Sequence, residues 1–77
     1  MPHIQWCMQR ANEYFDDGDV HGGFMSFLSD VRKDPTTAHA ETRPLLMACA
    51  ASLSVEEARV VLAMYSASYE WVAPVLS

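Results

Sequence analysis

The sequence predicts an all-α protein, a small four-helix domain in which an antiparallel helical hairpin packs on a C-terminal helix pair. Three observations lead to this fold class. Apolar residues recur every three or four positions along most of the chain, as in amphipathic helices. Stop and start signals for helices interrupt that pattern, and no stretch alternates apolar and polar residues like a strand. With 77 residues, the chain is expected to form one domain over residues 1–77.

The first helix is expected over residues 3–17. One of its faces is apolar at the helical spacing, while the opposite face carries amides and acids. The helix then stops and a new one starts, because Gly18 suits the left-handed conformation that closes a helix and Asp19 is a good N-cap. The apolar face consists of Ile4, Cys7, Met8, Ala11, Tyr14 and Phe15.

The second helix is expected over residues 20–34, because Asp34 precedes Pro35 and a residue before proline is pushed out of the helical region. Its first turn contains Gly22 and Gly23, each of which destabilises a helix by about 0.5–1 kcal/mol relative to alanine. Close approach of a neighbouring helix is one reason for a glycine there. The apolar face consists of Val20, Phe24, Phe27, Leu28 and Val31, with Asp30, Arg32 and Lys33 expected to point outward.

A third helix is expected over residues 37–53, with a break or kink near Pro44. Thr36 or Thr37 is suited to cap its first turn. Proline fits the first turn of a helix but not its interior, so Pro44 marks a fresh start or a kink.

The fourth helix, expected over residues 54–72, has the clearest start signal in the chain. Ser54 and Glu57 form the pattern of a capping box, in which each side chain accepts a hydrogen bond from the other residue's backbone amide. Pro74 ends the helix. Its core-facing stripe consists of Ala58, Val61, Leu62, Tyr65, Tyr69 and Val72.

The charge of the chain argues against direct binding to nucleic acid. The formal net charge is −5, and the five lysines and arginines form no cluster beyond Arg32-Lys33. Phosphate backbones are bound by clustered lysine and arginine. An acidic surface also allows a protein to mimic nucleic acid and so bind a basic partner. The modest net charge of this chain is nevertheless ordinary for a soluble domain.

Cysteine usage and the absence of long apolar runs predict a cytoplasmic protein. Cys7 and Cys49 lie in apolar helix faces and are expected to be reduced core thiols, with a single disulfide or a redox pair as the alternative. Residues 1–9 lack the basic and apolar regions of a secretory signal. The longest apolar run, residues 45–51, is far shorter than the roughly 18 residues of a membrane span.

The stretch FDDGDVHGGF, residues 15–24, is the best candidate for a metal site, but its spacing is wrong. A calcium loop needs oxygens at alternate positions and a closing glutamate, and no glutamate closes this one. His3, His21 and His39 have no zinc-ligand spacing. The serines lack a nucleophile elbow, and the cysteines have no histidine at a diagnostic spacing. We therefore predict no catalytic residue, no metal and no cofactor.

Residues 11–35 place small, aromatic and proline residues at fixed offsets: Ala11, Tyr14, Gly23, Phe27 and Pro35. With these offsets the stretch resembles a single tetratricopeptide helical hairpin. The resemblance implies that Gly23 packs one helix on the other. It departs from the repeat at Cys7 and Arg10, where tryptophan and leucine are usual, and no second copy follows. Because arrays need about three or more repeats, the resemblance implies a local hairpin geometry rather than membership of the repeat family.

Two further stretches of the chain are SFLSDVRKDPTTAH, residues 26–39, and SLSVEEAR, residues 52–59. Through these two stretches, residues 11–66 resemble small hypothetical proteins encoded by phages of mycobacteria and related actinobacteria. Residues 69–77 do not match the usual ending of those proteins. The resemblance implies a small accessory phage protein made in the host cytoplasm, and it assigns no functional residue.

The fourth helix carries a second apolar stripe beside its core stripe: Val60, Met64, Ala67 and Trp71. A helix that is apolar on two faces is either deeply buried or covers a partner. In one interpretation, Met64 and Trp71 pack on the first helix near Trp6 and Met8 as part of the core. In the other, the stripe is an exposed patch for self-association or for capture of another protein.

These features lead to the expectation of a non-enzymatic phage accessory protein that binds a host or phage protein, with a homodimer through the C-terminal helix as one form. The candidate partner-binding residues are Val60, Met64 and Trp71. Asp16 and Asp17 are added because two carboxylates at the negative end of the first helix are disfavoured by its dipole. The alternatives are a nucleic-acid-related regulator, acting directly or by acidic mimicry, and an enzyme with an unrecognised site.

Overall fold

The computed structural model describes residues 3–68, which form four helices and no strand. The all-α fold class is confirmed. The predicted site residue Trp71 and the end of the predicted last helix lie outside the described residues. In chain order the helices are α1 (His3–Asp16), α2 (Val20–Val31), α3 (Arg43–Ala50) and α4 (Val55–Ala67).

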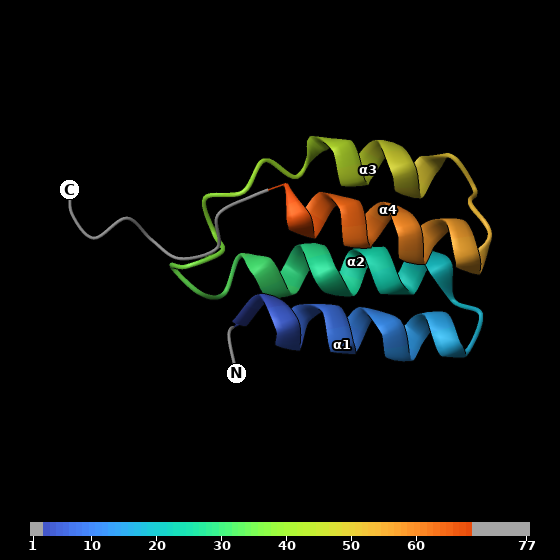
Figure 1. The fold of residues 1–77 in the computed structure, drawn as a ribbon, viewed down its shortest axis with the longest axis horizontal. Helices are drawn as coiled ribbons and strands as arrows, with labels where there is room; N and C mark the ends of the chain where they lie inside the picture. The colour runs from blue at the N-terminus through green and yellow to red at the C-terminus, as the bar shows by residue number, and fades with distance from the viewer. Residues whose placement is uncertain (1–2, 69–77) are drawn as a thin grey trace.

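The four helices form an up-and-down bundle (Figure 1). Each helix packs on the one before it, and α4 returns to pack on α1, so that the contacts close into a ring. Aromatic pairs fill the centre: the Phe15 and Phe24 ring centroids lie 5.6 Å apart, and those of Phe27 and Tyr65 lie 6.0 Å apart, both edge to face. The two pairs link α1 to α2 and α2 to α4. No helix in the described part of the chain is both long and apolar enough to cross a bilayer.

The turn between α1 and α2 has the stop and start that the sequence predicts. Gly18 has a φ of +80°, in the left-handed region that glycine tolerates. Its amide donates to the Phe15 carbonyl oxygen over 2.9 Å. The Asp19 carboxylate caps α2 by accepting a hydrogen bond from the Gly22 amide over 2.8 Å.

Gly23 lies at a close contact between α1 and α2. The residue is buried, and a Cβ added to it would collide with the Phe15 ring and lie 3.0 Å from the Ala11 carbonyl oxygen. Only a residue without a side chain fits this contact without movement of a neighbour. The predicted packing of one helix on the other at Gly23 is therefore confirmed.

The connection from α2 to α3 is built from turns where the sequence suggested helix. Helix α2 ends at Val31, and α3 begins only at Arg43. The Asp34 carboxylate accepts hydrogen bonds from the amide and the hydroxyl of Thr36, and these bonds hold its pKa below its usual value. The buried Thr37 hydroxyl donates to the Val31 carbonyl oxygen over 2.6 Å. The side chains expected to cap a helix thus stabilise a non-helical connection.

The capping box at the start of α4 is confirmed. The Ser54 hydroxyl accepts from the Glu57 amide over 3.2 Å, and the Glu57 carboxylate accepts from the Ser54 amide over 2.9 Å. The bonds from Ser54 lower the pKa of Glu57. At the start of α3, Pro44 occupies the first turn, where its missing amide proton leaves no hydrogen bond unmade.

Candidate functional site

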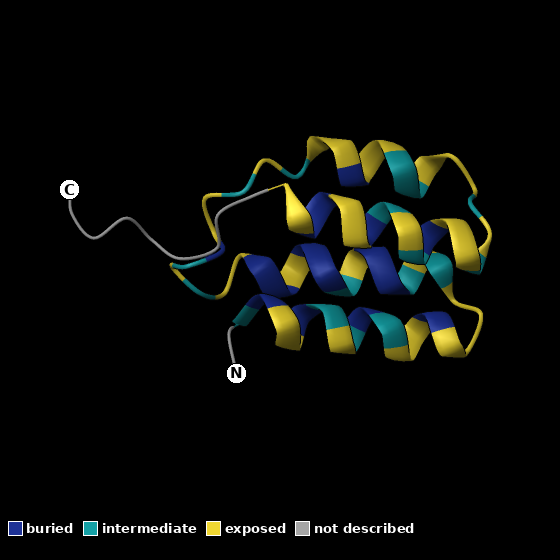
Figure 2. Cartoon of the chain, viewed as in Figure 1, coloured by how far each residue is buried: buried dark blue, intermediate teal, exposed yellow. Residues whose placement is uncertain are grey.

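Helix α3 is the least buried helix of the bundle. Of its eight residues, all of which the structure describes, Leu45 alone is buried. Leu46 is 46% exposed and Met47 is 72% exposed. Figure 2 shows this contrast, because α3 is mostly yellow whereas the inward faces of α1 and α2 are dark blue.

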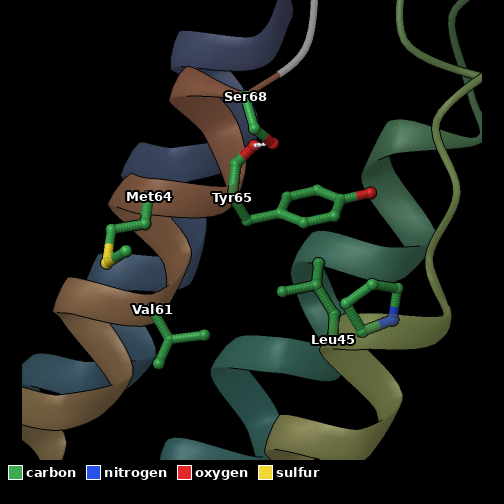
Figure 3. A pocket seen from close by; sticks show the side chains of 6 residues that line it. Leu45, Val61, Met64, Tyr65 and Ser68 are labelled. Atoms are coloured by element: carbon green, nitrogen blue, oxygen red, sulfur yellow. Dashed lines mark hydrogen bonds between the residues drawn. The ribbon is translucent and has the colours of Figure 1, made fainter.

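A shallow apolar groove runs between α3 and the C-terminal half of α4 (Figure 3). Tyr65 points across it toward Leu45, and its hydroxyl donates to the Glu41 carbonyl oxygen over 2.6 Å. Met64 lies at the rim with 68% of its surface exposed. The groove is lined by Pro44, Leu45, Val61, Met64, Tyr65 and Ser68.

Two further hollows with exposed apolar residues lie beside this groove. Val61 also lines a second hollow, at the start of α4, where Val60 is 57% exposed. On the other side of α3, Met25 and Leu46 line a third hollow against α2. We define the α3 surface as the exposed apolar residues around this helix: Met25, Leu46, Met47, Val60 and Met64.

Two of the residues expected to bind a partner, Val60 and Met64, belong to this surface. Met64, at 68% exposure, and Trp6, at 37%, are both exposed and neither belongs to the buried core. Trp6 instead stacks on the His3 ring, with the Arg10 guanidinium 5.0 Å from its ring centroid.

The carboxylates at the end of α1 have different surroundings. Asp16 accepts a hydrogen bond from Arg59 Nη2 over 2.5 Å, and Arg59 Nη1 donates to the Asn12 side chain. The pair ties α1 to α4, and the arginine offsets the unfavourable position of Asp16 at the negative end of the helix. Asp17 is exposed and lines a small polar hollow that includes Tyr14.

Asp30, expected to point outward, is buried with 1% of its surface exposed. Its carboxylate accepts hydrogen bonds from Arg10 Nε over 2.7 Å and from Lys33 Nζ over 3.2 Å. Ser26 donates to it over 3.4 Å. The side chain is buried because α1 lies over it and Arg10 supplies a matching charge. A buried carboxylate with two cationic partners avoids the large desolvation penalty of an unpaired charge.

The structure also brings together Cys49 and His21, which are 28 residues apart. The Cys49 Sγ lies 3.1 Å from the His21 Nδ1, at the contact between α3 and α2. Spacing along the chain gave no sign of this pair, because it depends on how the third helix packs on the second. Both cysteines are free, and Cys7 alone is fully buried.

Cys7 lies against the charged cluster of Asp30. Burial, together with the nearby Asp30 charge, raises the pKa of the Cys7 thiol to about 11. The thiol is therefore protonated at neutral pH and packs as a small apolar side chain.

Neither a metal-ligand cluster nor a known relative points to a specific activity. Within residues 3–68, no three histidine, cysteine, aspartate or glutamate side chains are grouped to hold a metal ion. The chain matches no protein-family model, no curated protein and no solved structure. The α3 surface is thus the candidate site that the geometry favours.

Proposed function

We propose that this protein is a small, non-enzymatic accessory protein that binds another protein through the α3 surface. The observation that carries the proposal is the grouping of Leu46, Met47, Val60 and Met64 around a helix with one buried residue. Contiguous apolar patches on a small soluble domain mark sites of interaction.

The composition of the surface suits an adaptable protein contact. Methionine is flexible and polarisable, and it packs against partners of different shape. The groove beside Tyr65 adds a concave place for an apolar side chain of the partner. Charged residues border this surface, with Glu56 at one end and Arg43 near the other, as in the polar rim of protein interfaces.

The setting that we propose is a phage-infected bacterium. The resemblance of residues 26–39 and 52–59 to small proteins of actinobacterial phages supports it. In that setting the partner is a host or phage protein in the cytoplasm, and binding interferes with a host process. A second copy of the chain is the other partner to test, because the exposed stripe on α4 suits a homodimer.

The proposal is tested by placing a photo-cross-linking amino acid at position 64 in cells that make the protein. Cross-linked products are identified by mass spectrometry, and the same amino acid at Gln9, on the exposed face of α1, serves as the control site. We expect a discrete product from position 64 that position 9 does not give.

A matched pair of substitutions decides whether the surface carries the binding. Met64→Asp adds a charge to the surface, whereas Ala63→Asp adds the same charge to an exposed position about 100° away around α4. In affinity capture of the partner that cross-linking identified, we expect Met64→Asp to abolish binding and Ala63→Asp to retain it. Sedimentation of both variants distinguishes a second copy from a different protein. Full capture by a folded Met64→Asp protein would refute the proposal.

A further inference from the structure

Cys49 and His21 place a nucleophile beside a base at the surface of the bundle. The Sγ and Nδ1 atoms are 3.1 Å apart, within hydrogen-bond distance for a sulfur donor. Cys49 is half-buried and His21 is exposed, so small molecules approach the pair from solvent. No part of the proposed protein-binding function uses this pair.

Both side chains are held in place by their helices. Cys49 lies one turn after Leu45, the residue that anchors α3 in the core, and therefore on the same face of the helix. His21 is in the first turn of α2, which the Asp19 cap fixes through the Gly22 amide. The thiol and the imidazole therefore both project from helices rather than from the turns that connect them.

We propose that Cys49 is a modification site for small disulfides and soft electrophiles, with His21 as the base that accepts the thiol proton. A thiolate is the reactive form of cysteine, and an adjacent imidazole generates it. In reaction with a disulfide, the thiol proton moves to His21 Nδ1 and a bond forms between the Cys49 Sγ and one sulfur of the reagent. The sulfur–sulfur bond of the reagent breaks, and its other sulfur leaves as a thiolate with the electron pair.

The second cysteine of the chain provides an internal comparison. Cys7, a residue of α1, is fully buried in the core, whereas Cys49 is in part accessible to solvent. Burial and the charge of Asp30 favour the protonated form of Cys7. A reagent that distinguishes the two thiols therefore reports on the surroundings of Cys49.

The test is the rate of reaction of the folded protein with 5,5′-dithiobis(2-nitrobenzoate), with the modified residue located by mass spectrometry. We expect Cys49 to react faster than Cys7 and faster than free N-acetylcysteine near pH 7. His21→Asn and His21→Gln should slow the reaction of Cys49 by at least about tenfold, because a positioned general base typically contributes about 10²- to 10⁴-fold. His39→Asn, at another exposed histidine, should leave the rate unchanged.

The dependence on pH separates base assistance from a change in accessibility. The ratio of the wild-type reaction rate to the His21→Asn rate should be largest near neutral pH. This ratio should fall to one by about pH 10, where hydroxide deprotonates thiols without a neighbouring base. Equal rates for Cys49 and N-acetylcysteine would overturn the proposal. It would equally be overturned by folded His21 variants that react as fast as the wild type.

Discussion

The contact at Gly23 makes a prediction whose sign distinguishes packing from helix propensity. Replacing a helical glycine by alanine normally stabilises a helix by about 0.5–1 kcal/mol. At Gly23 the new Cβ would collide with the Phe15 ring and press on the Ala11 carbonyl oxygen, 3.0 Å away. Overpacking of this kind destabilises a core by about 1–3 kcal/mol. We therefore expect Gly23→Ala to lower the free energy of unfolding by about 0.5–2 kcal/mol.

Urea unfolding followed by circular dichroism measures this change, and a domain of this size should also lose roughly 4–8 °C of melting temperature per kcal/mol. Phe15→Leu removes the ring that the new methyl group would meet. In a double-mutant cycle, Gly23→Ala should therefore destabilise the Phe15→Leu protein by less than half as much as the wild type. A Gly23→Ala protein more stable than the wild type would refute the reasoning. An equal effect of Gly23→Ala in the wild type and in the Phe15→Leu protein would refute it as well.

Three further predictions concern the cap, the buried charge and the buried thiol. Ser54→Ala should lower the free energy of unfolding by about 1 kcal/mol in urea, whereas Ser54→Gly should lower it by only a few tenths; equal effects would argue against the cap. Asp30→Ala should lower the free energy of unfolding by about 1–3 kcal/mol, because Arg10 and Lys33 lose their hydrogen-bond acceptor. Asp30→Asn, which keeps the size of the side chain, should lower the free energy of unfolding by less. Wild-type stability in Asp30→Ala would contradict this account. The free energy of unfolding should fall as the pH rises from about 9 toward about 11, because the unfolded chain releases the Cys7 proton before the folded protein does. Cys7→Ala should lose that part of the slope, which pH titration of both proteins measures, and identical slopes would show that Cys7 does not contribute.

Features set by neighbouring residues were predictable from the sequence. The turn at Gly18, the caps at Asp19 and Ser54, and the close contact at Gly23 each depend on residues within a few positions, or on the requirement for a missing side chain. The apolar stripe that contains Val60 and Met64 was also predictable, because helical periodicity fixes which residues share a face, but the sequence left open whether this stripe is buried or exposed.

Pairings between side chains far apart in the sequence were not predictable. The position of Asp30 beside Arg32 and Lys33 predicts that it lies at the surface. In the structure Asp30 is buried, and Arg10, twenty residues earlier, pairs with it while 41% of the Arg10 side chain stays exposed. The pairing of Asp16 with Arg59 spans 43 residues. Such pairs depend on which helix lies beside which, and a single sequence carries no periodic signal for that choice.

Because few residues of α3 are buried, the free energy of local unfolding is expected to be lower for α3 than for the other helices. A helix with one fully buried residue, Leu45, can detach at a lower free energy than the global unfolding transition, while α1, α2 and α4 remain packed through their aromatic side chains. Amide hydrogens of α3 should therefore exchange with solvent earlier than those of α2. A partner bound to the α3 surface would suppress this opening, so exchange in α3 would report occupancy of the site even when no other part of the protein changes.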